Sequence, residues 1–304
     1  MNLTNKQIEE IKLRISNVLI NNFKWNIEGE IKLIGSGVIN AVFQIKEKNL
    51  GLLAVRTPWL AEENMMDKHS SGIISLKKEA DIAQHCHKYH LQVPKVHKLY
   101  LSRETNFLVS EFIAGDDKLI SSCEIGKLIS RIHKIPLDGL SIIDQNKQSL
   151  SQIIPRRIIN RSQTLKEITK IDVLLPSLEE LEAILNTSHN EQCLLHLDVR
   201  RPNLIGVDGS IQSIIDWDNA FVGDPIMELM RISETEELNV EEFLKGYNNN
   251  RMIENTNNII QLIYRLDTAL MLSILFTSFV QDSKKSEHYI IRVRSICAEI
   301  MKNL

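Results

Sequence analysis

The most informative stretch of this sequence, residues 194–204, reads LLHLDVRRPNL. It places Asp198 and Asn203 five positions apart, with short apolar runs on both sides. Apolar runs of this kind predict buried strands, so the polar residues between them predict a loop that the strands hold at each end. His196 and Arg200 stand beside the central carboxylate. The pattern indicates a loop that carries chemistry.

A second acidic position follows 13 residues after Asn203. Residues 211–215 (IQSII) are typical of a strand, and Asp216 stands at its end in the sequence Asp216-Trp217-Asp218. Phosphoryl transfer needs a carboxylate that orients or deprotonates the attacking hydroxyl, and it needs oxygen ligands for Mg²⁺. The ordered pattern H-x-D-x4-N, followed by a strand that ends in Asp, supplies both. The two segments together therefore predict phosphoryl transfer.

A glycine-rich turn lies near the N-terminus, where residues 35–40 read GSGVIN. Gly35, Ser36, Gly37 and Asn40 have two readings: a backbone cradle for phosphate oxygens, or a tight hairpin turn that needs no ligand. The chain contains no Walker A loop. A dinucleotide fingerprint is excluded as well, because Asn40 replaces the third glycine and a strand pattern follows.

Hydrophobic periodicity divides the chain into two unequal parts. A capping box at Thr4 predicts a helix over 4–22. Strands are predicted at 30–34, 39–45, 52–57, 96–101 and 107–113, and one helix at 73–90 is inserted among them. Helices dominate afterwards, at 124–135, 150–161, 178–186, 225–233, 240–247, 258–279 and 286–301, with short strands at 194–196, 204–207 and 211–215 and a loop at 248–250. The predicted fold class is α+β, with a small N-terminal antiparallel sheet lobe (1–113) and a larger, mainly α-helical C-terminal lobe (114–304).

The composition narrows the class of protein. The chain has 304 residues, of which 43% are hydrophobic and 25% charged, and this excludes a disordered or fibrous chain. The net charge of −3 argues against a nucleic-acid partner. The longest apolar stretch, residues 269–280, is too short to span a membrane. The cysteines form no C-x-x-C pair, which predicts free thiols and a cytoplasmic location; they are Cys86, Cys123, Cys193 and Cys297.

In this order, the segments resemble the aminoglycoside phosphotransferase and choline kinase-like family, a branch of the protein-kinase-like fold that phosphorylates small molecules. The resemblance covers residues 31–232, about two-thirds of the chain. It implies a bilobal protein-kinase-like fold with one active site between the lobes. Residues 108–115 (LVSEFIAG) resemble the hinge that binds adenine, which implies nucleotide contacts at Glu111 and Ile113.

The resemblance also implies a role for each residue of the two acidic segments. Asp198 corresponds to the catalytic base, and Asn203 and Asp216 correspond to the Mg²⁺ ligands. His196 corresponds to a residue that supports the catalytic loop. Asp218 supports either a second metal or only the loop.

The N-terminal residues receive nucleotide-binding roles by the same resemblance. Residues 35–40 correspond to the nucleotide loop, Arg56 to the basic residue that binds the phosphates, and Glu79 to the helix glutamate that pairs with it. The implied cofactors are ATP (or GTP) and Mg²⁺.

Two positions depart from the wider fold. Arg56 stands where kinases usually have Lys, and the two side chains bind phosphate differently. Arg56 is either a functional variant, as in macrolide kinase-like branches, or a sign of lost catalysis. Arg200, two residues after Asp198, either stabilises charge in the transition state and so counts as catalytic, or is a solvated loop residue.

The predicted function is ATP- and Mg²⁺-dependent transfer of the γ-phosphate to a hydroxyl of a small molecule. The first predicted substrate is an aminoglycoside-like or other cationic antibiotic, in resistance or self-protection. The alternatives are a metabolite kinase of the choline, homoserine or biosynthetic-intermediate type, and a catalytically silent nucleotide-binding module. We expect a monomer or homodimer without a nucleic-acid or membrane partner; the sequence does not identify substrate-binding residues.

Two groups of charged residues bear on the substrate. Acidic residues in the C-terminal helices would suit a cationic substrate; they are Glu228, Glu234, Glu236, Glu237 and Asp267. The arginines of one predicted helix, Arg156, Arg157 and Arg161, either hold an anionic substrate or coat a solvated helix face.

Overall fold

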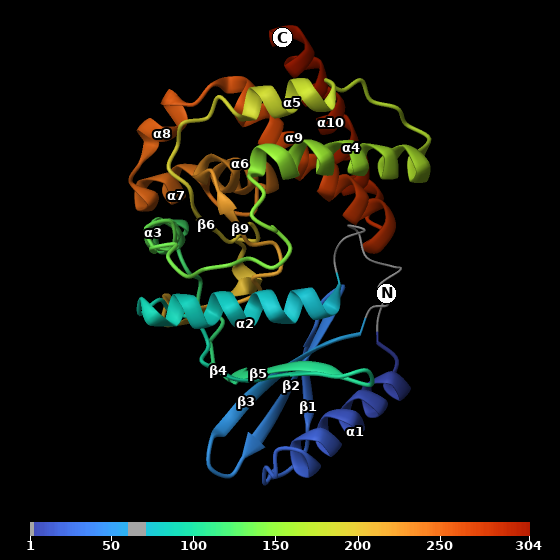
Figure 1. Ribbon diagram of the computed structural model, residues 1–304, viewed down its shortest axis with the longest axis vertical. Coiled ribbons are helices and arrows are strands. Elements are labelled where there is room, and N and C mark those ends of the chain that lie inside the picture. The colour runs from blue at the N-terminus through green and yellow to red at the C-terminus, as the bar shows by residue number, and fades with distance from the viewer. Residues whose placement is uncertain (1–2, 60–70) are drawn as a thin grey trace.

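Five antiparallel strands form the sheet of the N-terminal part, in the order β1-β2-β3-β5-β4 (Figure 1). The computed structural model describes residues 3–59 and 71–304 of the chain. The strands are β1 (Lys32–Ser36), β2 (Asn40–Glu47), β3 (Gly51–Pro58), β4 (Val96–Leu101) and β5 (Asn106–Glu111).

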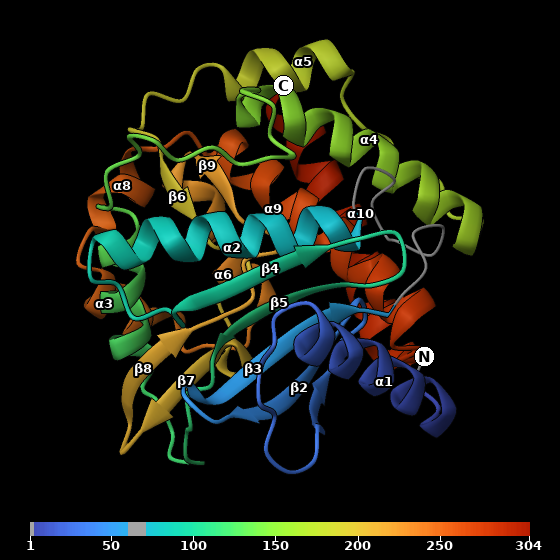
Figure 2. The same cartoon turned by 60° about the horizontal axis from the view of Figure 1, so that its bottom comes forward.

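Helix α1 (Asn5–Asn21) covers one face of this sheet (Figures 1 and 2). The predicted capping box is confirmed, since Thr4 Oγ1 accepts from the Gln7 amide and Gln7 Oε1 accepts from the Thr4 amide. Side chains alternate between the two faces of a strand, so Val55 packs in the core under α1 while its neighbour Arg56 lies on the opposite face. The pleat of β3 thus directs Arg56 toward the rest of the molecule.

Helix α2 (Gly72–Lys88) crosses between the sheet and the helical part (Figure 1). Near its N-terminus, Leu76 packs against Leu108 of β5. Further along, Ile82 and Cys86 join the hydrophobic core of the helical part. Because one helix belongs to both cores, it couples them and holds Glu79 between them. The division of the chain at residue 113 stays a prediction.

The C-terminal part is mainly helical, and its long helix α9 lies between α6 and α10 with contacts to α4. The helices are α3 (Ser122–Ile132), α4 (Leu150–Thr169), α5 (Leu178–Leu185), α6 (Pro225–Thr235), α7 (Val240–Tyr247), α8 (Asn250–Asn255), α9 (Asn258–Ile274), a π-helical segment η3 (Leu275–Phe279) and α10 (Ser283–Asn303).

Two small antiparallel strand pairs carry the acidic loops. The strands are β6 (Cys193–Leu195) with β9 (Phe221–Gly223), and β7 (Leu204–Val207) with β8 (Ser210–Ile214). Asp208 and Gly209 connect β7 to β8 and both have positive φ, as a two-residue hairpin turn requires. A 3₁₀ turn, η2 (Arg201–Asn203), precedes β7.

The predicted α+β architecture is confirmed, and most predicted elements appear within a few residues of their expected bounds. Strand β9 and helix α8 were not predicted; α8 begins at Asn250, inside the expected loop. Helix α4 continues eight residues beyond the predicted end at 161; the extension was missed because residues 162–169 are mostly polar and only Leu165 among them is buried. That stretch lacks the apolar period on which the prediction depended.

The segment Asn258–Phe279 has the length and apolar character to cross a bilayer. However, 72% of its most apolar window is buried inside the protein. It is therefore a core helix of this fold, surrounded by other helices on most sides.

Candidate active site

Asp198 lies in the loop between β6 and η2, and its carboxylate is held by two neighbours. Asn203 Nδ2 donates to Asp198 Oδ2 over 2.7 Å and to the Asp198 carbonyl over 2.9 Å. Arg200 Nε donates to the same Oδ2 over 3.2 Å. The Asn203 amide nitrogen is thus occupied, which leaves the Asn203 amide oxygen as the atom for a cation. Arg200 thus binds the Asp198 carboxylate while its side chain stays 42% exposed, so both predicted readings of Arg200 stay open.

His196 supports this loop from beneath. Its Nδ1 accepts the backbone N–H of Asp198 over 3.1 Å, and its Nε2 lies 3.0 Å from the carbonyl oxygen of Ile215. A neutral ring protonated at Nε2 satisfies both bonds. The ring is fully buried and lies 4.5 Å from the Trp217 ring, centroid to centroid. His196 therefore ties the loop of Asp198 to the strand end that carries Asp216.

Glu228 of α6 fixes the same loop from a third side. Its carboxylate accepts the backbone N–H of Leu197 over 2.5 Å and that of His196 over 3.1 Å. It also lies 2.9 Å from His133 Nε2. Leu197 has φ +58°, an uncommon conformation for a branched apolar residue, and the two bonds to Glu228 hold it. From the sequence, Glu228 was offered as an acid for a cationic substrate. This was wrong, because the carboxylate is buried and accepts hydrogen bonds from the backbone of the loop.

Arg56 meets three carboxylates, and we call Arg56, Glu79, Asp216 and Asp218 the carboxylate-rich centre. Arg56 Nη2 lies 2.8 Å from Asp216 Oδ1 and 2.8 Å from Asp218 Oδ2, and Nη1 lies 3.6 Å from Glu79 Oε2. The pairing of Arg56 with Glu79 is therefore present. The two additional contacts to Asp216 and Asp218 were not foreseen.

The carboxylates of this centre differ in acidity. Burial raises the pKa of Glu79 to about 7, although Arg56 opposes the shift. Burial also raises the pKa of Asp218. Burial acts in the same direction on Asp216, but the charge and hydrogen bond of Arg56 outweigh it, so the pKa of Asp216 is lowered. Asp216 also has φ +71°, which points to a backbone position maintained for function.

The centre fits a divalent cation by the chemistry of its donors. Ligand oxygens of Glu79, Asp216 and Asp218 lie within 4.8 Å of one another. The backbone N–H of Ile215 donates to the Asn203 carbonyl oxygen over 3.0 Å, which brings Asn203 beside Asp216. Carboxylate and amide oxygens are the ligands that Mg²⁺ prefers.

The glycine turn faces the same cavity. Asn40 Nδ2 donates to Asp218 Oδ2 and to Ser75 Oγ, which connects the turn to the carboxylate-rich centre. A Cβ placed on Gly35 would meet no described atom within 4 Å, so the fold itself does not require glycine there. Open space beside a backbone of this kind suits a bulky anionic ligand such as a phosphate chain.

A cavity of about 720 Å³ joins these groups. The predicted site residues that line it are Gly35, Ser36, Gly37, Asn40, Arg56, Asp198, Arg200, Asn203, Asp216 and Asp218. Glu79 and His196 support it from behind. Glu111 and Ile113, the predicted hinge contacts, do not line it; Glu111 ends β5 with an exposed side chain, and its amide donates to the Lys95 carbonyl.

The far wall of the cavity was not found from the sequence. It comprises the end of α6, the end of α9, η3 and the start of α10, and it includes Arg231, Thr235, Glu237, Met271, Phe276 and Phe279. Glu237 was among the acidic residues offered for a cationic substrate, but the other residues are separated along the chain and share no spacing, so no sequence signal marks them. Phe276 and Phe279 belong to the π-helical segment η3, an irregularity often found at functional sites.

Behind this wall lies an arginine-rich cluster, formed by Arg157, Arg161 and Arg231 around Asp267. Arg157 binds Asp267 through Nε (2.9 Å) and Nη2 (2.6 Å), and Arg161 Nη1 lies 3.1 Å from Asp267 Oδ1. Arg157 and Arg161 do not coat a solvated face, because these side chains form internal ion pairs. Arg161 also lines the large cavity, so its contact with an anionic substrate stays a prediction. Arg156 alone is solvated, with a side chain 53% exposed.

Two further acidic residues are unavailable to a cationic substrate. Asp267 is fully buried under its arginines. Glu234 is buried and binds Arg265 (2.7 Å) and Arg292 (2.6 Å). Only Glu236 and Glu237 of the five predicted acidic residues are exposed.

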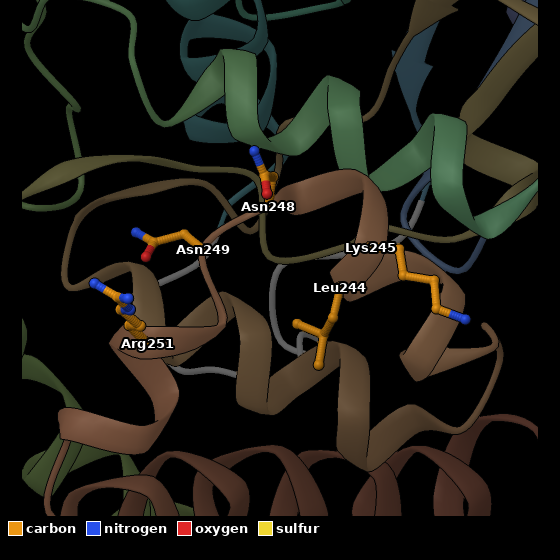
Figure 3. Close-up of a pocket in the computed structure, with 5 residues that line it drawn as sticks. All are labelled: Leu244, Lys245, Asn248, Asn249 and Arg251. Carbon is orange, nitrogen blue, oxygen red and sulfur yellow. The ribbon is translucent and has the colours of Figure 1, made fainter.

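A second, smaller cavity of about 450 Å³ lies at the junction of α7 and α8 (Figure 3). It is lined by Leu244, Lys245, Asn248, Asn249 and Arg251. None of these residues lines the large cavity, and none was a predicted site residue.

Comparisons with known proteins match this architecture. A model of the "Phosphotransferase enzyme family" matches residues 30–251. A comparison with curated protein sequences gives no match. A structure assigned as a fructosamine-3-kinase, from Haemophilus somnus 129PT, superposes with a TM-score of 0.66 and 21% identity over 96% of this chain and 98% of that chain.

Two other solved structures have the same fold. A choline/ethanolamine kinase family protein from Mesorhizobium loti gives a TM-score of 0.60 and 16% identity over 93% of each chain. An aminoglycoside phosphotransferase in ternary complex with AMP-PNP and hygromycin B gives 0.63 and 16% over 95% of this chain and 97% of that one. At these identities the likeness concerns the fold, and the predicted protein-kinase-like fold is confirmed.

Proposed function

Because the chain belongs to the phosphotransferase enzyme family, as its resemblance to aminoglycoside and choline kinases predicted, we propose that it transfers the γ-phosphate of ATP to a hydroxyl of a small molecule. The observation that carries the proposal is that Asp198, the carboxylates Asp216 and Asp218, and the glycine turn all line one cavity, where Asn203 joins the loop of Asp198 to the strand end of Asp216.

In the proposed reaction Asp198 orients the acceptor hydroxyl and takes its proton. The hydroxyl oxygen attacks the γ-phosphorus, a new phosphorus–oxygen bond forms, and the bond to the β-phosphate oxygen breaks. The products are the phosphate ester and ADP. A carboxylate that already accepts bonds from Asn203 and Arg200 is preorganised for this work. Arg200 then stabilises charge on the transferring group.

In the proposed complex, the carboxylate-rich centre and the glycine turn hold the nucleotide. Arg56 binds phosphate oxygens, Glu79 keeps the guanidinium in place, and the glycine turn covers the phosphates. Asn203 and Asp216 would hold Mg²⁺, which would neutralise phosphate charge when bound. Asp218 keeps Arg56 and Asn40 in position. AMP-PNP in one structural neighbour supports ATP as the nucleotide, and GTP stays the alternative.

The acceptor class is open between a metabolite and an antibiotic. Neighbours are described as fructosamine, choline/ethanolamine and aminoglycoside kinases, so the family accommodates each. The internal use of Glu228, Glu234 and Asp267 removes most of the acidic surface that favoured a cationic antibiotic. We therefore propose a metabolite as the first candidate acceptor and an antibiotic as the second. A cytoplasmic location is supported by four free cysteines.

A silent nucleotide-binding module is the second candidate, and one observation favours it. Arg56 binds Asp216 and Asp218 directly, at the position that the proposed metal and phosphates need. An active enzyme must exchange these contacts for contacts to the nucleotide when MgATP binds.

The test measures the phosphorylated product by mass spectrometry, with MgATP or MgGTP and a panel of hydroxylated acids, sugars and amines. We expect Asp198→Asn to lose about 10²–10⁴-fold in kcat while MgATP still raises its melting temperature. Asp208→Asn, at the exposed β7–β8 turn, is the matched control and should act as wild type. Stabilisation by MgATP without any product would favour the silent module, and unaltered MgATP stabilisation of Asp216→Ala would contradict the metal assignment.

A further inference from the structure

Arg231 lies on α6, one turn beyond Glu228. Residues three apart on a helix share a face, and Glu228 holds the loop that carries Asp198. Arg231 is therefore positioned by the same rigid element as the proposed catalytic base. It lines the large cavity together with Asp198.

The guanidinium of Arg231 has no carboxylate partner in the part of the chain that the structure describes. Its side chain is buried, with only 5% of the residue exposed, and its one hydrogen bond runs from Nη2 to the Met271 sulfur over 3.0 Å. A thioether is a weak acceptor, so the other N–H donors of a buried guanidinium are left for the cavity. A buried charge of this kind is costly unless something pairs with it.

The surrounding groups do not supply that pair. The charge of Asp267 acts on Arg231, but Arg157 and Arg161 already occupy the oxygens of this carboxylate. Asp198 is engaged by Arg200 and Asn203. Burial, and secondarily the charges of Arg157 and Arg161, lowers the pKa of Arg231 to about 10 although Asp198 and Asp267 oppose this shift. The side chain is still a cation at neutral pH.

The remainder of the far wall has a defined character. Met271, Leu275, Phe276 and Phe279 give it an apolar surface. Lys285 Nζ lies 4.9 Å from the centre of the Phe276 ring, so this aromatic face already carries a cation. The wall also contains one exposed carboxylate, Glu237, but the two cations Arg231 and Lys285 outnumber it, so an anion is favoured beside Arg231.

We propose, resting on the kinase function above, that the acceptor carries an anionic group that binds Arg231 and an apolar portion that packs on Met271 and Phe276. Its hydroxyl then reaches Asp198 while its carboxylate or phosphate pairs with the guanidinium. The planar fork of arginine binds either oxyanion with two parallel bonds. The acceptor class is an amphipathic hydroxy acid or a hydroxylated phosphate ester, in contrast to a cationic amine.

The first experiment measures binding with the nucleotide site filled by Mg-AMP-PNP, so that Arg56 is not available to the probes. Mandelate is compared with mandelamide, ribose 5-phosphate with ribose, and choline and kanamycin form a cationic arm. Thermal stabilisation of the wild type by mandelate or ribose 5-phosphate, but not by the neutral partner, is the expected result. Stabilisation of the protein by mandelate would identify the anionic group as a carboxylate, and stabilisation by ribose 5-phosphate would identify it as a phosphate. Stabilisation only by choline or kanamycin, or no preference for an anion, would overturn the inference.

The second experiment uses Arg231→Met and Arg231→Lys, with Arg156→Met as the matched control on the solvated face of α4. Loss of the buried pair should raise the Kd of the binding anion by at least about 30-fold in Arg231→Met, with a smaller rise in Arg231→Lys. The Mg-AMP-PNP stabilisation should persist in each variant, which reports folding and nucleotide binding. An equal weakening for anionic and neutral probes would contradict the role of Arg231.

The two proposals fail separately. If product forms from neutral or cationic acceptors and Arg231→Met turns them over as the wild type does, the kinase function stands and the anionic acceptor is wrong. If Mg-AMP-PNP does not stabilise the wild type, or Asp198→Asn matches the wild type in product formation, the kinase function is wrong.

Discussion

The carboxylate-rich centre and the arginine-rich cluster are opposites in composition. In the first, three carboxylates share Arg56. In the second, three arginines gather around Asp267, and two of them bind it directly. The first therefore carries surplus negative charge and the second surplus positive charge, and both border the same cavity through Asp216 and Arg231.

The difference teaches how the cavity divides its work. Surplus carboxylates suit a metal ion with its nucleotide, since the metal brings the missing positive charge. In the other cluster the ion pairs of Arg157 and Arg161 hold α4 to α9 and are structural. Arg231 lines the cavity without a carboxylate partner among the described residues, and it is the arginine of this cluster that we assign to a ligand. The two regions therefore suit two different ligands: the carboxylate-rich centre suits a metal–nucleotide complex, and Arg231 suits an anionic acceptor.

The largest effect is expected from removal of Asp267. Asp267→Ala removes the buried carboxylate that Arg157 and Arg161 bind, and breaking a buried pair in this way costs about 3–5 kcal/mol in the free energy of unfolding. Asp218→Asn, in the carboxylate-rich centre, should cost less than half as much, because Arg56 keeps Asp216 and Glu79. Urea unfolding measures both variants. Equal losses would show that the two regions do not differ in the way described.

A smaller effect, with a distinctive pH dependence, is expected at Glu79. Its pKa of about 7 lies above the ordinary value of 4.5, so the folded protein retains a proton that the unfolded chain loses between these values. Stability must therefore fall as the pH rises through this window, by up to about 3 kcal/mol. Glu79→Gln has no such proton, so its stability relative to wild type should rise between pH 5 and pH 8.

The carboxylate of the arginine-rich cluster should not titrate in this pH window, and a solvated residue of α4 supplies the control variant. Although burial opposes it, Arg157 and Arg161 lower the pKa of Asp267, so this carboxylate stays ionised throughout the window. Arg156 is a solvated residue that pairs with Glu182 and belongs to neither region, so the pH dependence of stability in Arg156→Ala should follow that of the wild type. The measurement is the urea unfolding midpoint of wild type, Glu79→Gln and Arg156→Ala at pH 5, 6, 7 and 8. Parallel pH profiles for wild type and Glu79→Gln would disprove the assignment of the pH dependence to Glu79.

The same contrast explains what the sequence could predict. Asp198 and Asp216 follow short apolar strands and Asn203 precedes one, and the pairing of β7 with β8 brings Asn203 beside Asp216, so these three positions could be found from the sequence. Strand alternation likewise directed Arg56 away from the core under α1. The order of strands and helices, and therefore the fold class, follows from the same periodicity.

The other region had no such signal. Arg157, Arg231 and Asp267 come from α4, α6 and α9, and only the tertiary packing of these helices makes them neighbours. A polar residue in a helical pattern is normally solvated, so Arg157 and Glu228 were given to the surface or to a substrate. The π-helical turn of η3, which presents Phe276 to the cavity, also depends on packing that periodicity does not record.

The smallest effect is expected at Arg156, which precedes Arg157 on α4. The Arg156 side chain is 53% exposed and its Nη2 lies 3.6 Å from Glu182, whereas Arg157 binds a fully buried carboxylate at 2.6 Å. Exposed ion pairs contribute little because water screens them and the long side chains lose entropy. Arg156→Ala should therefore change the free energy of unfolding by less than about 0.5 kcal/mol, while Arg157→Ala should cost several times more, since it also removes a guanidinium that lies 5.4 Å from the Phe221 ring. Urea unfolding of the two variants compares adjacent residues of one helix. The two residues differ in burial and in their contacts. Similar losses in the free energy of unfolding would therefore mean that the ion pairs of the arginine-rich cluster contribute little and that both losses reflect helix propensity.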